Sequence, residues 1–208
     1  GEGDTGKNTG GMGAYSPSRL ISDDLDKKIL EKIIYPTLNA LKDMNSEYRG
    51  FLYAGLMIVQ NEPYLIEYNV RMGDPECQAL MMRLKTDLLQ IIDSATNNKL
   101  NELRIKWDNK NCITIVLCAK GYPLDYKKNS EIKNLSNISS NTNNQIFHAG
   151  TYLKNNKIYS SGGRVLNFTT LSKSLIEARD KCIANINKLG WDEGFFRKDI
   201  GWRIINKK

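Results

Sequence analysis

Apolar residues recur at helical spacing in two long stretches of the first half of the chain. Ser22, followed by two aspartates, has the form of a helix N-cap, and apolar positions then return every three or four residues as far as Leu41. We expect a kink or break at Pro36, because proline removes a helical hydrogen bond. A second helix is predicted from residues 74–76, Asp-Pro-Glu with the aspartate as N-cap, to about Asn97.

Between these helices the pattern changes to that of strands. Residues 51–59 form an apolar run, and residues 64–70 form a second run in which polar and apolar side chains alternate. Only residues 60–63 separate the two runs, which is a typical length for a hairpin connection. The sequence therefore predicts an antiparallel hairpin.

The second half of the chain is dominated by short strands and one helix. Residues 112–119 are apolar and rich in β-branched side chains, as in a buried strand. A helix is expected over residues 172–189, with Gly190 as its left-handed stop. Residues 127–144 are rich in Asn, Ser and Lys and are predicted to be an exposed loop. Four further strands are expected, at residues 145–148, 151–153, 157–160 and 164–170.

The first 17 residues contain six glycines and are predicted to form a loop with neither helix nor strand. Gly1, Gly6 and Lys7 approach the pattern of a P-loop, but Asn8 stands where that motif has Ser or Thr, and no strand precedes it. We therefore reject a P-loop. The exposed N–H groups of such a loop can hold a phosphate or another anion. A flexible surface loop is an equally good interpretation of the composition.

These elements indicate an α+β fold in two parts. Residues 100–111 form a polar connector, and we place a first domain at residues 1–106 and a second at residues 107–208. The glycine loop opens the chain without a preceding element, so we expect an upstream half of the same polypeptide.

Composition and charge exclude several classes of protein. The chain has 208 residues and a formal net charge of +7, but its lysines are dispersed among asparagines and form no stripe with aromatic residues, so nucleic-acid binding is not expected. No apolar run is long enough to span a membrane. The four cysteines form no Cys-x-x-Cys pair and there is one histidine, which excludes a disulfide scaffold and a zinc site. We expect a cytoplasmic protein.

The strongest candidate for chemistry is a row of polar residues on the second hairpin strand. At a period of two, Glu67, Asn69 and Arg71 lie on one face. A carboxylate and an amide oxygen are hard ligands suited to Mg²⁺ that also binds nucleotide phosphates, and the guanidinium would stabilise a phosphoryl or acyl-phosphate group. The alternative is a solvent-facing strand with a cross-strand salt bridge.

Several motifs together resemble the phosphoribosylamine–glycine ligase family, a branch of the ATP-grasp superfamily. The match covers nearly the whole chain in order and spacing. It includes residues 3–17, Gly-Asp-Thr-Gly-Lys-Asn-Thr-Gly-Gly-Met-Gly-Ala-Tyr-Ser-Pro, and residues 66–76, Ile-Glu-Tyr-Asn-Val-Arg-Met-Gly-Asp-Pro-Glu. Further matching segments are residues 50–57, 81–88, 121–123, 147–151, 162–166 and 197–203.

The resemblance implies a fold, a reaction and a set of site residues. The fold is the C-terminal lobe of an ATP-grasp domain, an antiparallel sheet with helices, followed by a small α+β C-terminal domain. The reaction joins phosphoribosylamine to glycine with ATP, through glycyl phosphate, to give glycinamide ribonucleotide, ADP and phosphate in purine biosynthesis. Glu67 and Asn69 match the metal pair for Mg²⁺ or Mn²⁺, and Arg71 matches the arginine near the transferred phosphoryl group. The substrate-binding candidates are Asn8, Thr9, Gly10, Gly11, Met12, Gly13 and Asp74.

Two departures from the family pattern and two alternatives remain. Residues 51–59 contain no acidic residue, although many ATP-grasp relatives have one there, and the lobe with the adenine pocket is not in this chain. We therefore expect residues 1–208 alone to be inactive. The alternatives are another ATP-grasp ligase, such as a bicarbonate-using carboxylase, and a non-catalytic phosphoribosyl-binding module. His148 is left outside the site as a structural or interface residue.

Overall fold

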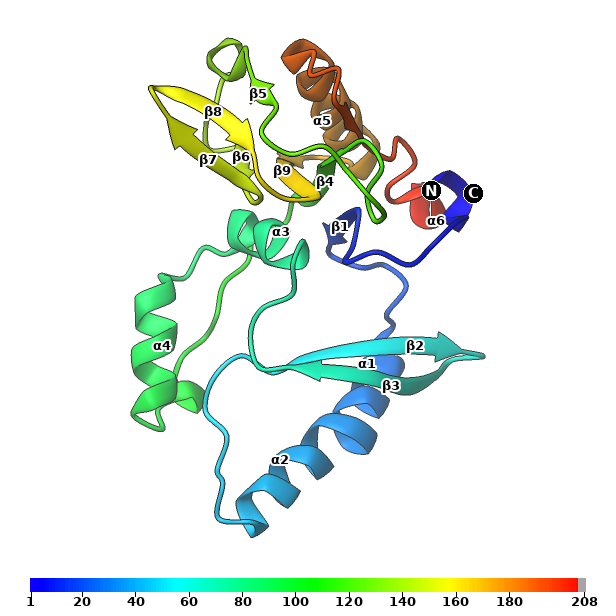
Figure 1. Ribbon diagram of the computed structural model, residues 1–208. Coiled ribbons are helices and arrows are strands. Elements are labelled where there is room, and N and C mark those ends of the chain that lie inside the picture. The colour runs from blue at the N-terminus through cyan, green and yellow to red at the C-terminus, as the bar shows by residue number, and fades with distance from the viewer. Residues whose placement is uncertain (206–208) are drawn as a thin grey trace. The chain divides into compact units, whose positions relative to one another are not determined.

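The structure is a computed structural model that describes residues 1–205 (Figure 1). The chain forms two compact units. Unit 1 contains Gly1–Pro17, Asp74–Arg83 and the chain from Asp108 onward, and unit 2 contains Ser18–Gly73 and Leu84–Trp107. Unit 1 is thus assembled from three separate segments, whereas the predicted division at residues 106 and 107 cuts the chain once. That division stays a prediction, and the last three residues of its second domain lie outside the described residues.

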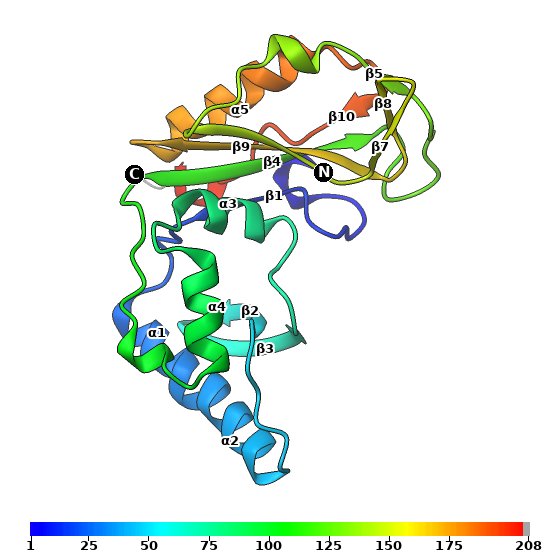
Figure 2. The ribbon, with the colours of Figure 1, turned by 90° about the vertical axis from the view of Figure 1, so that its left-hand side faces the viewer.

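Unit 1 is built on an antiparallel sheet whose strand order is β1 (Gly13–Ser16), β4 (Asn111–Ala119), β9 (Arg164–Ser172) and β6 (Asn144–His148). The short strand β10 (Gly194–Phe195) pairs with the end of β4. Helix α5 (Leu175–Leu189) covers one face of the sheet and α3 (Glu76–Arg83) covers the other (Figure 2). Because both faces are covered, every residue of β4 is buried, which agrees with its nearly continuous apolar sequence.

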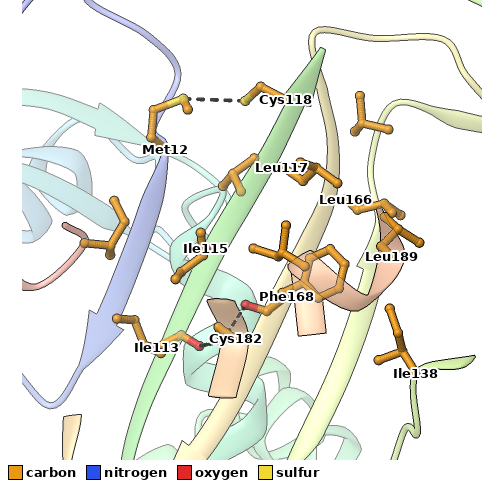
Figure 3. Close-up of a cluster of buried hydrophobic side chains, with 14 of the residues drawn as sticks. Met12, Ile113, Ile115, Leu117, Cys118, Ile138, Leu166, Phe168, Cys182 and Leu189 are labelled. Carbon is orange, nitrogen blue, oxygen red and sulfur yellow. Dashed lines mark hydrogen bonds between the residues drawn. The ribbon is translucent and has the colours of Figure 1, made fainter. Parts of the chain in front are cut away.

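The core of unit 1 lies between the sheet and α5, where Phe168, Cys182 and Leu189 meet the side chains of β4 (Figure 3). Phe168 is 2% exposed, and burying a side chain of this size stabilises the fold by about 1.5–3 kcal/mol. Local signals fix the ends of the helix. Ser174 accepts a hydrogen bond from the Glu177 N–H, and Gly190 ends the helix at φ 60°. The predicted strand at 112–119 and helix at 172–189 are confirmed, with small differences at their ends.

Smaller elements complete unit 1. A three-stranded sheet has the order β5 (Glu131–Ile132), β8 (Lys157–Ser160) and β7 (Thr151–Lys154). Single turns occur at η1 (Glu2–Asp4) and η4 (Leu135–Asn137), and α6 (Trp202–Ile205) follows β10. The strands predicted at residues 145–148, 151–153, 157–160 and 164–170 correspond to β6, β7, β8 and β9.

Unit 2 contains a helical segment and the hairpin. Helix α1 (Asp23–Ile29) leads through a π-helical turn, η2 (Leu30–Ile34), into α2 (Tyr35–Asp43). The strands β2 (Tyr53–Val59) and β3 (Glu62–Asn69) pair antiparallel, as predicted. Helix α4 (Leu88–Thr96) and the turn η3 (Leu100–Glu102) complete the unit. The hydroxyl of Tyr68 is 2.6 Å from that of Thr37 and fixes β3 to the helical segment.

Hydrophobic burial in unit 2 is limited. Among its described apolar residues, Leu25, Ile33 and Ile91 are buried. By contrast, several large apolar side chains of the hairpin and its end are exposed, namely Met57, Val59, Tyr64, Leu65, Ile66 and Val70. A two-stranded hairpin is only marginally stable by itself, and a surface of this kind is typical of a face that another element covers.

Three predictions of secondary structure are wrong. Residues 13–16 form β1, which pairs with β4 from Gly13 opposite Ile115 to Ser16 opposite Cys112. The prediction of a loop is wrong there because the backbone of these residues pairs with β4 and forms strand hydrogen bonds, whatever the glycine content of the segment before it. The segment at residues 127–144 is not a simple exposed loop, since it contains β5 and its Ile132 and Ile138 are buried.

The third wrong prediction concerns the single helix to Asn97, which is two helices. The first of them, α3, ends at Arg83. The break at residues 84–87 is stabilised by backbone hydrogen bonds from the N–H groups of Lys85 and Thr86 to the carbonyl oxygen of Lys106. Asp87 then caps α4 through its carboxylate. The irregularity expected at Pro36 is found one turn earlier, as the π-helical turn η2.

No helix within residues 1–205 is both long and apolar enough to cross a membrane.

Candidate active site

The structure brings Glu67 and Asn69 together on β3. The amide nitrogen of Asn69 donates a hydrogen bond to the Oε1 atom of Glu67, at 3.0 Å. Opposite Glu67 on β2 stands Gly55, and a Cβ atom added there would lie 3.0 Å from the Cγ of Glu67. The glycine therefore leaves the room that the Glu67 side chain occupies.

Arg71 does not continue the row as a strand residue, because β3 ends at Asn69. The predicted period of two therefore fails at this position. The exposed guanidinium of Arg71 donates a hydrogen bond to the carbonyl oxygen of Met72, at 2.9 Å. Glu67 is exposed, as in the alternative of a solvent-facing strand. Within residues 1–205 neither Glu67 nor Arg71 forms an ion pair, so the cross-strand salt bridge of that alternative is not found.

The chemistry of Glu67 and Asn69 fits a hard divalent cation that they share with other ligands. Among residues 1–205 no group of three or more His, Cys, Asp and Glu side chains could hold a metal ion. A carboxylate and an amide oxygen are suitable for Mg²⁺, which usually keeps several waters and binds substrate phosphates in addition to one or two protein ligands. The pair can therefore supply part of a metal site and needs phosphate or water oxygens to complete it.

Residues 8–13, the part of the glycine-rich segment predicted to bind substrate and hereafter called the glycine loop, lie in unit 1. Hydrogen bonds hold this loop, although its composition is that of a flexible segment. The N–H of Gly10 donates to the hydroxyl of Tyr122 (3.0 Å), and the N–H of Gly11 donates to the hydroxyl of Thr9 (3.2 Å). These two N–H groups are therefore already engaged and do not form an open anion cradle. Asn8 and Gly10 are exposed, and Thr9 and Gly11 are half-buried.

The end of the glycine loop belongs to the core. The side chain of Met12 is buried, with its sulfur 3.5 Å from that of Cys118 (Figure 3). Its carbonyl accepts a hydrogen bond from the N–H of Val116, and Gly13 is the first residue of β1. A substrate contact by the Met12 side chain would require displacement of the core. A role for these two residues in substrate binding stays a prediction.

Asp74 lies in unit 1 with the glycine loop. Its Oδ2 atom is 2.9 Å from a guanidinium nitrogen of Arg164, and its Oδ1 atom accepts a hydrogen bond from the Gln78 side chain, at 3.1 Å. Arg164 also donates to the carbonyl oxygen of Gly10, at 2.6 Å. One arginine therefore connects two predicted substrate-binding elements. The N-cap role of Asp74 stays a prediction.

Sequence reasoning missed Arg164 and Tyr122 as parts of this cluster. Both lie in segments that match the family, but their contacts with the glycine loop span more than 100 residues of sequence. A signal was present in the neighbouring glycines. A Cβ at Gly163 would lie 2.2 Å from the Tyr122 ring, so a bulkier residue cannot stand there. Such a glycine marks a close approach, although the sequence does not say to what.

A charged network fixes the start of the chain to its described C-terminal part. Arg197 pairs with both Asp4 (2.9 Å) and Asp199 (2.7 Å), and Arg203 also pairs with Asp4 (2.8 Å). The hydrogen bonds from Arg203 and Arg197 hold the pKa of Asp4 below its ordinary value. The hydrogen bond from Arg197 lowers the pKa of Asp199 in the same way, although partial burial opposes it. The C-terminal Arg-Lys-Asp segment thus anchors the residues that precede the glycine loop.

His148 lies at the end of β6, exposed, with its Nδ1 atom 2.9 Å from the hydroxyl of Thr151. Its hydrogen-bond partner, Thr151, is not among the residues predicted for the site. The cluster that unit 1 assembles is therefore Asp74, Arg164, Tyr122 and the glycine loop, and the cluster in unit 2 is Glu67 with Asn69.

Comparisons with known proteins identify the family of this chain. Two family models match, those of the ATP-grasp (A) domain and the C domain of phosphoribosylglycinamide synthetase, over residues 1–77 and 112–203. A phosphoribosylamine–glycine ligase from Brucella melitensis is 42% identical over 208 residues, which are all of this chain and 49% of that protein. The chain thus spans about half the length of the curated relatives it matches.

Solved structures give the same fold. The crystal structure of the phosphoribosylamine–glycine ligase from Thermotoga maritima matches with a TM-score of 0.80 and 33% identity, over 95% of this chain and 48% of that one. A biotin carboxylase from Campylobacter jejuni matches with a TM-score of 0.61 at 15% identity, over 94% of this chain and 42% of that one, which shows a common fold only. The predicted α+β, ATP-grasp-type fold is confirmed.

Proposed function

Because the chain belongs to the phosphoribosylglycinamide synthetase family, we propose that the polypeptide carrying it is an ATP-dependent ligase that joins phosphoribosylamine to glycine. The products are glycinamide ribonucleotide, ADP and phosphate, as in purine biosynthesis. The observation that carries the proposal is the contact between Glu67 and Asn69, the two hard-oxygen side chains of β3. Phosphoryl transfer depends on positioning and charge neutralisation, which agrees with a site that has no Ser, His and Asp triad.

The reaction has two steps. The glycine carboxylate attacks the γ-phosphorus of ATP, which forms glycyl phosphate and releases ADP. The amine of phosphoribosylamine then attacks the carbonyl carbon, the C–O bond to phosphate breaks, and an amine proton is lost to the surroundings.

Each candidate residue has a part in this scheme. Glu67 and Asn69 would hold Mg²⁺ or Mn²⁺, which when bound neutralises charge on the nucleotide phosphates. Arg71 carries a fixed positive charge that would stabilise the transferred phosphoryl group, at the cost of its hydrogen bond to Met72. The glycine loop (Asn8, Thr9, Gly10, Gly11, Met12 and Gly13) and Asp74 would bind glycine or the ribosylamine.

We further propose that the activity needs the rest of the polypeptide. The hairpin of unit 2 has two strands and leaves apolar side chains such as Ile66 and Val70 exposed, at 65% and 75%. An upstream half that adds strands to this hairpin would cover them and complete the ATP site. Residues 1–208 alone should therefore release no ADP above background. A cytoplasmic location is proposed with it, on the ground that the four cysteines are thiols rather than disulfides.

The test is an assay of ADP release by the full polypeptide, with phosphoribosylamine formed in situ, with and without glycine. The proposal expects release that requires both substrates and that falls to background in a Glu67→Ala variant. Release that ignores glycine and depends on bicarbonate would instead indicate a carboxylase. If no substrate combination released ADP, a non-catalytic phosphoribosyl-binding module would be the better account.

A further inference from the structure

We propose that Arg164 is a positioning residue, whose guanidinium holds the glycine loop and Asp74 in one fixed arrangement. The inference rests on the proposed function, since it concerns elements that would bind the substrates. It gives a role to a residue in the C-terminal part of the chain, outside the ATP-grasp segment.

The geometry of Arg164 is that of a clamp. The NH1 nitrogen donates to the carbonyl oxygens of Gly10 (2.6 Å) and Asp74 (2.7 Å), and NH2 donates to the carboxylate of Asp74 (2.9 Å). Arg164 is separated along the chain by 154 residues from Gly10 and by 90 from Asp74. Hydrogen bonds from a charged donor are among the stronger ones in proteins, and a planar guanidinium can make several at fixed angles.

Arg164 is itself held firmly enough to act as a reference point. It is the first residue of β9 and pairs with Cys118 of the buried strand β4. Its carbonyl accepts a hydrogen bond from the Gly150 N–H, at 2.9 Å, and the carbonyl of the preceding Gly163 accepts one from Ala119. The side chain is 22% exposed. Because the backbone of Arg164 is fixed in the sheet, its guanidinium can hold the loop in a fixed position relative to the core.

Two further contacts restrict the loop from other sides. The Tyr122 hydroxyl accepts from the Gly10 N–H, and Pro75 lies so close to Gly11 that an added Cβ would be 2.7 Å from its Cδ. Gly11 has φ +103°, which L side chains rarely adopt. Gly10 is therefore bound at both its N–H and its carbonyl, while Gly11 packs against the residue after Asp74.

Lysine cannot replace this clamp. Its ammonium is a single point on a flexible stem and cannot join two carbonyl oxygens and a carboxylate in one plane. Loss of the clamp would let the loop and Asp74 move independently. Because a misplacement of about 1 Å can cost on the order of 100-fold in rate, a small displacement would lower turnover even if substrates still bind.

The experiment compares Arg164→Lys with Arg179→Lys in the full polypeptide. Arg179 is a matched control, since its side chain is equally covered (21% exposed) but lies on α5, and within residues 1–205 its ion-pair partner is the adjacent Asp180. The first readout is amide hydrogen exchange of residues 8–13. The second is the separate measurement of kcat and of the KM for ATP, glycine and phosphoribosylamine.

The proposal expects exchange at residues 8–13 to become roughly 10-fold faster in Arg164→Lys and to stay unchanged in Arg179→Lys. It also expects kcat to fall by about 10-fold to 100-fold while the KM for ATP changes by less than about twofold. A Tyr122→Phe variant, which removes the acceptor for the Gly10 N–H, should accelerate exchange at that amide as well.

Two results would overturn the inference. Exchange in Arg164→Lys that equals the wild-type rate would mean that the guanidinium does not hold the loop. A loss seen only as a higher KM for phosphoribosylamine, with kcat unchanged, would mean that Arg164 binds this substrate directly. Failure of the proposed function is distinct from both, because the wild-type polypeptide would then show no glycine-dependent release of ADP while the exchange measurement still reports on the clamp.

Discussion

The amide of Asn69 and the carboxylate of Glu67 meet on one face of β3, with the amide nitrogen 3.0 Å from Oε1. This contact uses one oxygen of Glu67 and leaves the amide oxygen of Asn69 without a hydrogen-bond partner among residues 1–205. A cation that binds both side chains would therefore replace a single exposed hydrogen bond. Such an exchange costs little, because a hydrogen bond at the surface contributes about 1 kcal/mol net.

We predict that Glu67→Gln weakens metal binding without unfolding the hairpin. Glutamine keeps the shape of the side chain and removes the charge that attracts a divalent ion. The Mg²⁺ concentration that gives half the maximal rate of ADP release should rise by about 10-fold or more. Loss of a residue that only hydrogen-bonds a metal ligand already lowers metal affinity by about 10-fold, and Glu67 would be a ligand itself.

Glu62→Gln provides the control for this prediction. Glu62 belongs to the same strand, but its carboxylate pairs with Lys28 and Lys32, whose hydrogen bonds lower its pKa to about 2. Its replacement should leave the Mg²⁺ dependence as in the wild type. An unchanged dependence in Glu67→Gln would remove Glu67 from the metal site.

Gly13→Ala should detach β1 from the sheet. A Cβ at Gly13 would lie 2.7 Å from the carbonyl oxygen of Thr114 and 2.8 Å from Ile200, and neither the strand backbone nor this buried side chain can easily move away. We expect a destabilisation of about 1–3 kcal/mol, as for other overpacked sites. Hydrogen exchange of β1 and β4 measures it.

Gly1→Ala is the comparison for this effect, because the nearest atoms to its added Cβ, both of Thr5, lie 3.3 Å away at the exposed chain start. Exchange in β1 should be the same in Gly1→Ala and the wild type. Equal protection of β1 in Gly13→Ala would show that the strand can shift to accept a methyl group.

Acid should release the chain start from its C-terminal anchor. Hydrogen bonds from Arg203 and Arg197 lower the pKa of Asp4 from 3.8, and the hydrogen bond from Arg197 lowers that of Asp199. A lowered pKa in the folded state means that these ion pairs stabilise the fold above about pH 4 and lose that contribution as the pH falls below it. Exchange in residues 1–6 should therefore accelerate as the pH falls below 3.8, after correction for the intrinsic rate.

Asp199→Asn should remove part of this pH dependence and weaken the anchor already at neutral pH. We expect a loss of about 1 kcal/mol, near the low end for charged hydrogen bonds because the groups are partly solvated. Asp180→Asn is the control, since that carboxylate is 63% exposed and lies 3.6 Å from its arginine. A pH profile that is identical in Asp199→Asn and the wild type would contradict the assignment.

Three of the cysteine thiols should resist alkylation in the native protein. Burial raises the pKa of Cys112, Cys118 and Cys182 to about 12, so almost no thiolate is present at pH 8. Peptide mass spectrometry after iodoacetamide treatment should find these positions unmodified before unfolding in urea and modified after it. Half-buried Cys77 should react slowly in the native state. Alkylation of native Cys112 would contradict the buried β4.

The elements predicted most closely are those whose signals are local. The run at 112–119 is apolar throughout because β4 is covered on both faces, and its composition alone indicates this. The helix α5 begins and ends at Ser174 and Gly190, residues whose own chemistry stops or starts a helix. The hairpin and the meeting of Glu67 with Asn69 follow from the period of two along one strand.

The wrong predictions depend on partners that are remote in sequence. Strand β1 forms because its backbone pairs with β4, about 100 residues later in the chain. The sequence of residues 13–16 contains no local pattern that predicts this pairing. The break after Arg83 is likewise held by the carbonyl of Lys106, not by a proline or glycine at the break. Helical periodicity continues across such a break, since both halves still bury apolar side chains.

The sequence by itself determined the strand with the Glu67 and Asn69 pair and the family, because alternation and ordered motifs are properties of neighbouring residues. Only the tertiary structure decided that the glycine loop is held at Gly10 by Arg164 and Tyr122 and that Asp74 shares the same guanidinium. These contacts exist because the folded sheet brings distant segments within hydrogen-bond distance. No spacing along the chain encodes which carbonyl an arginine will reach.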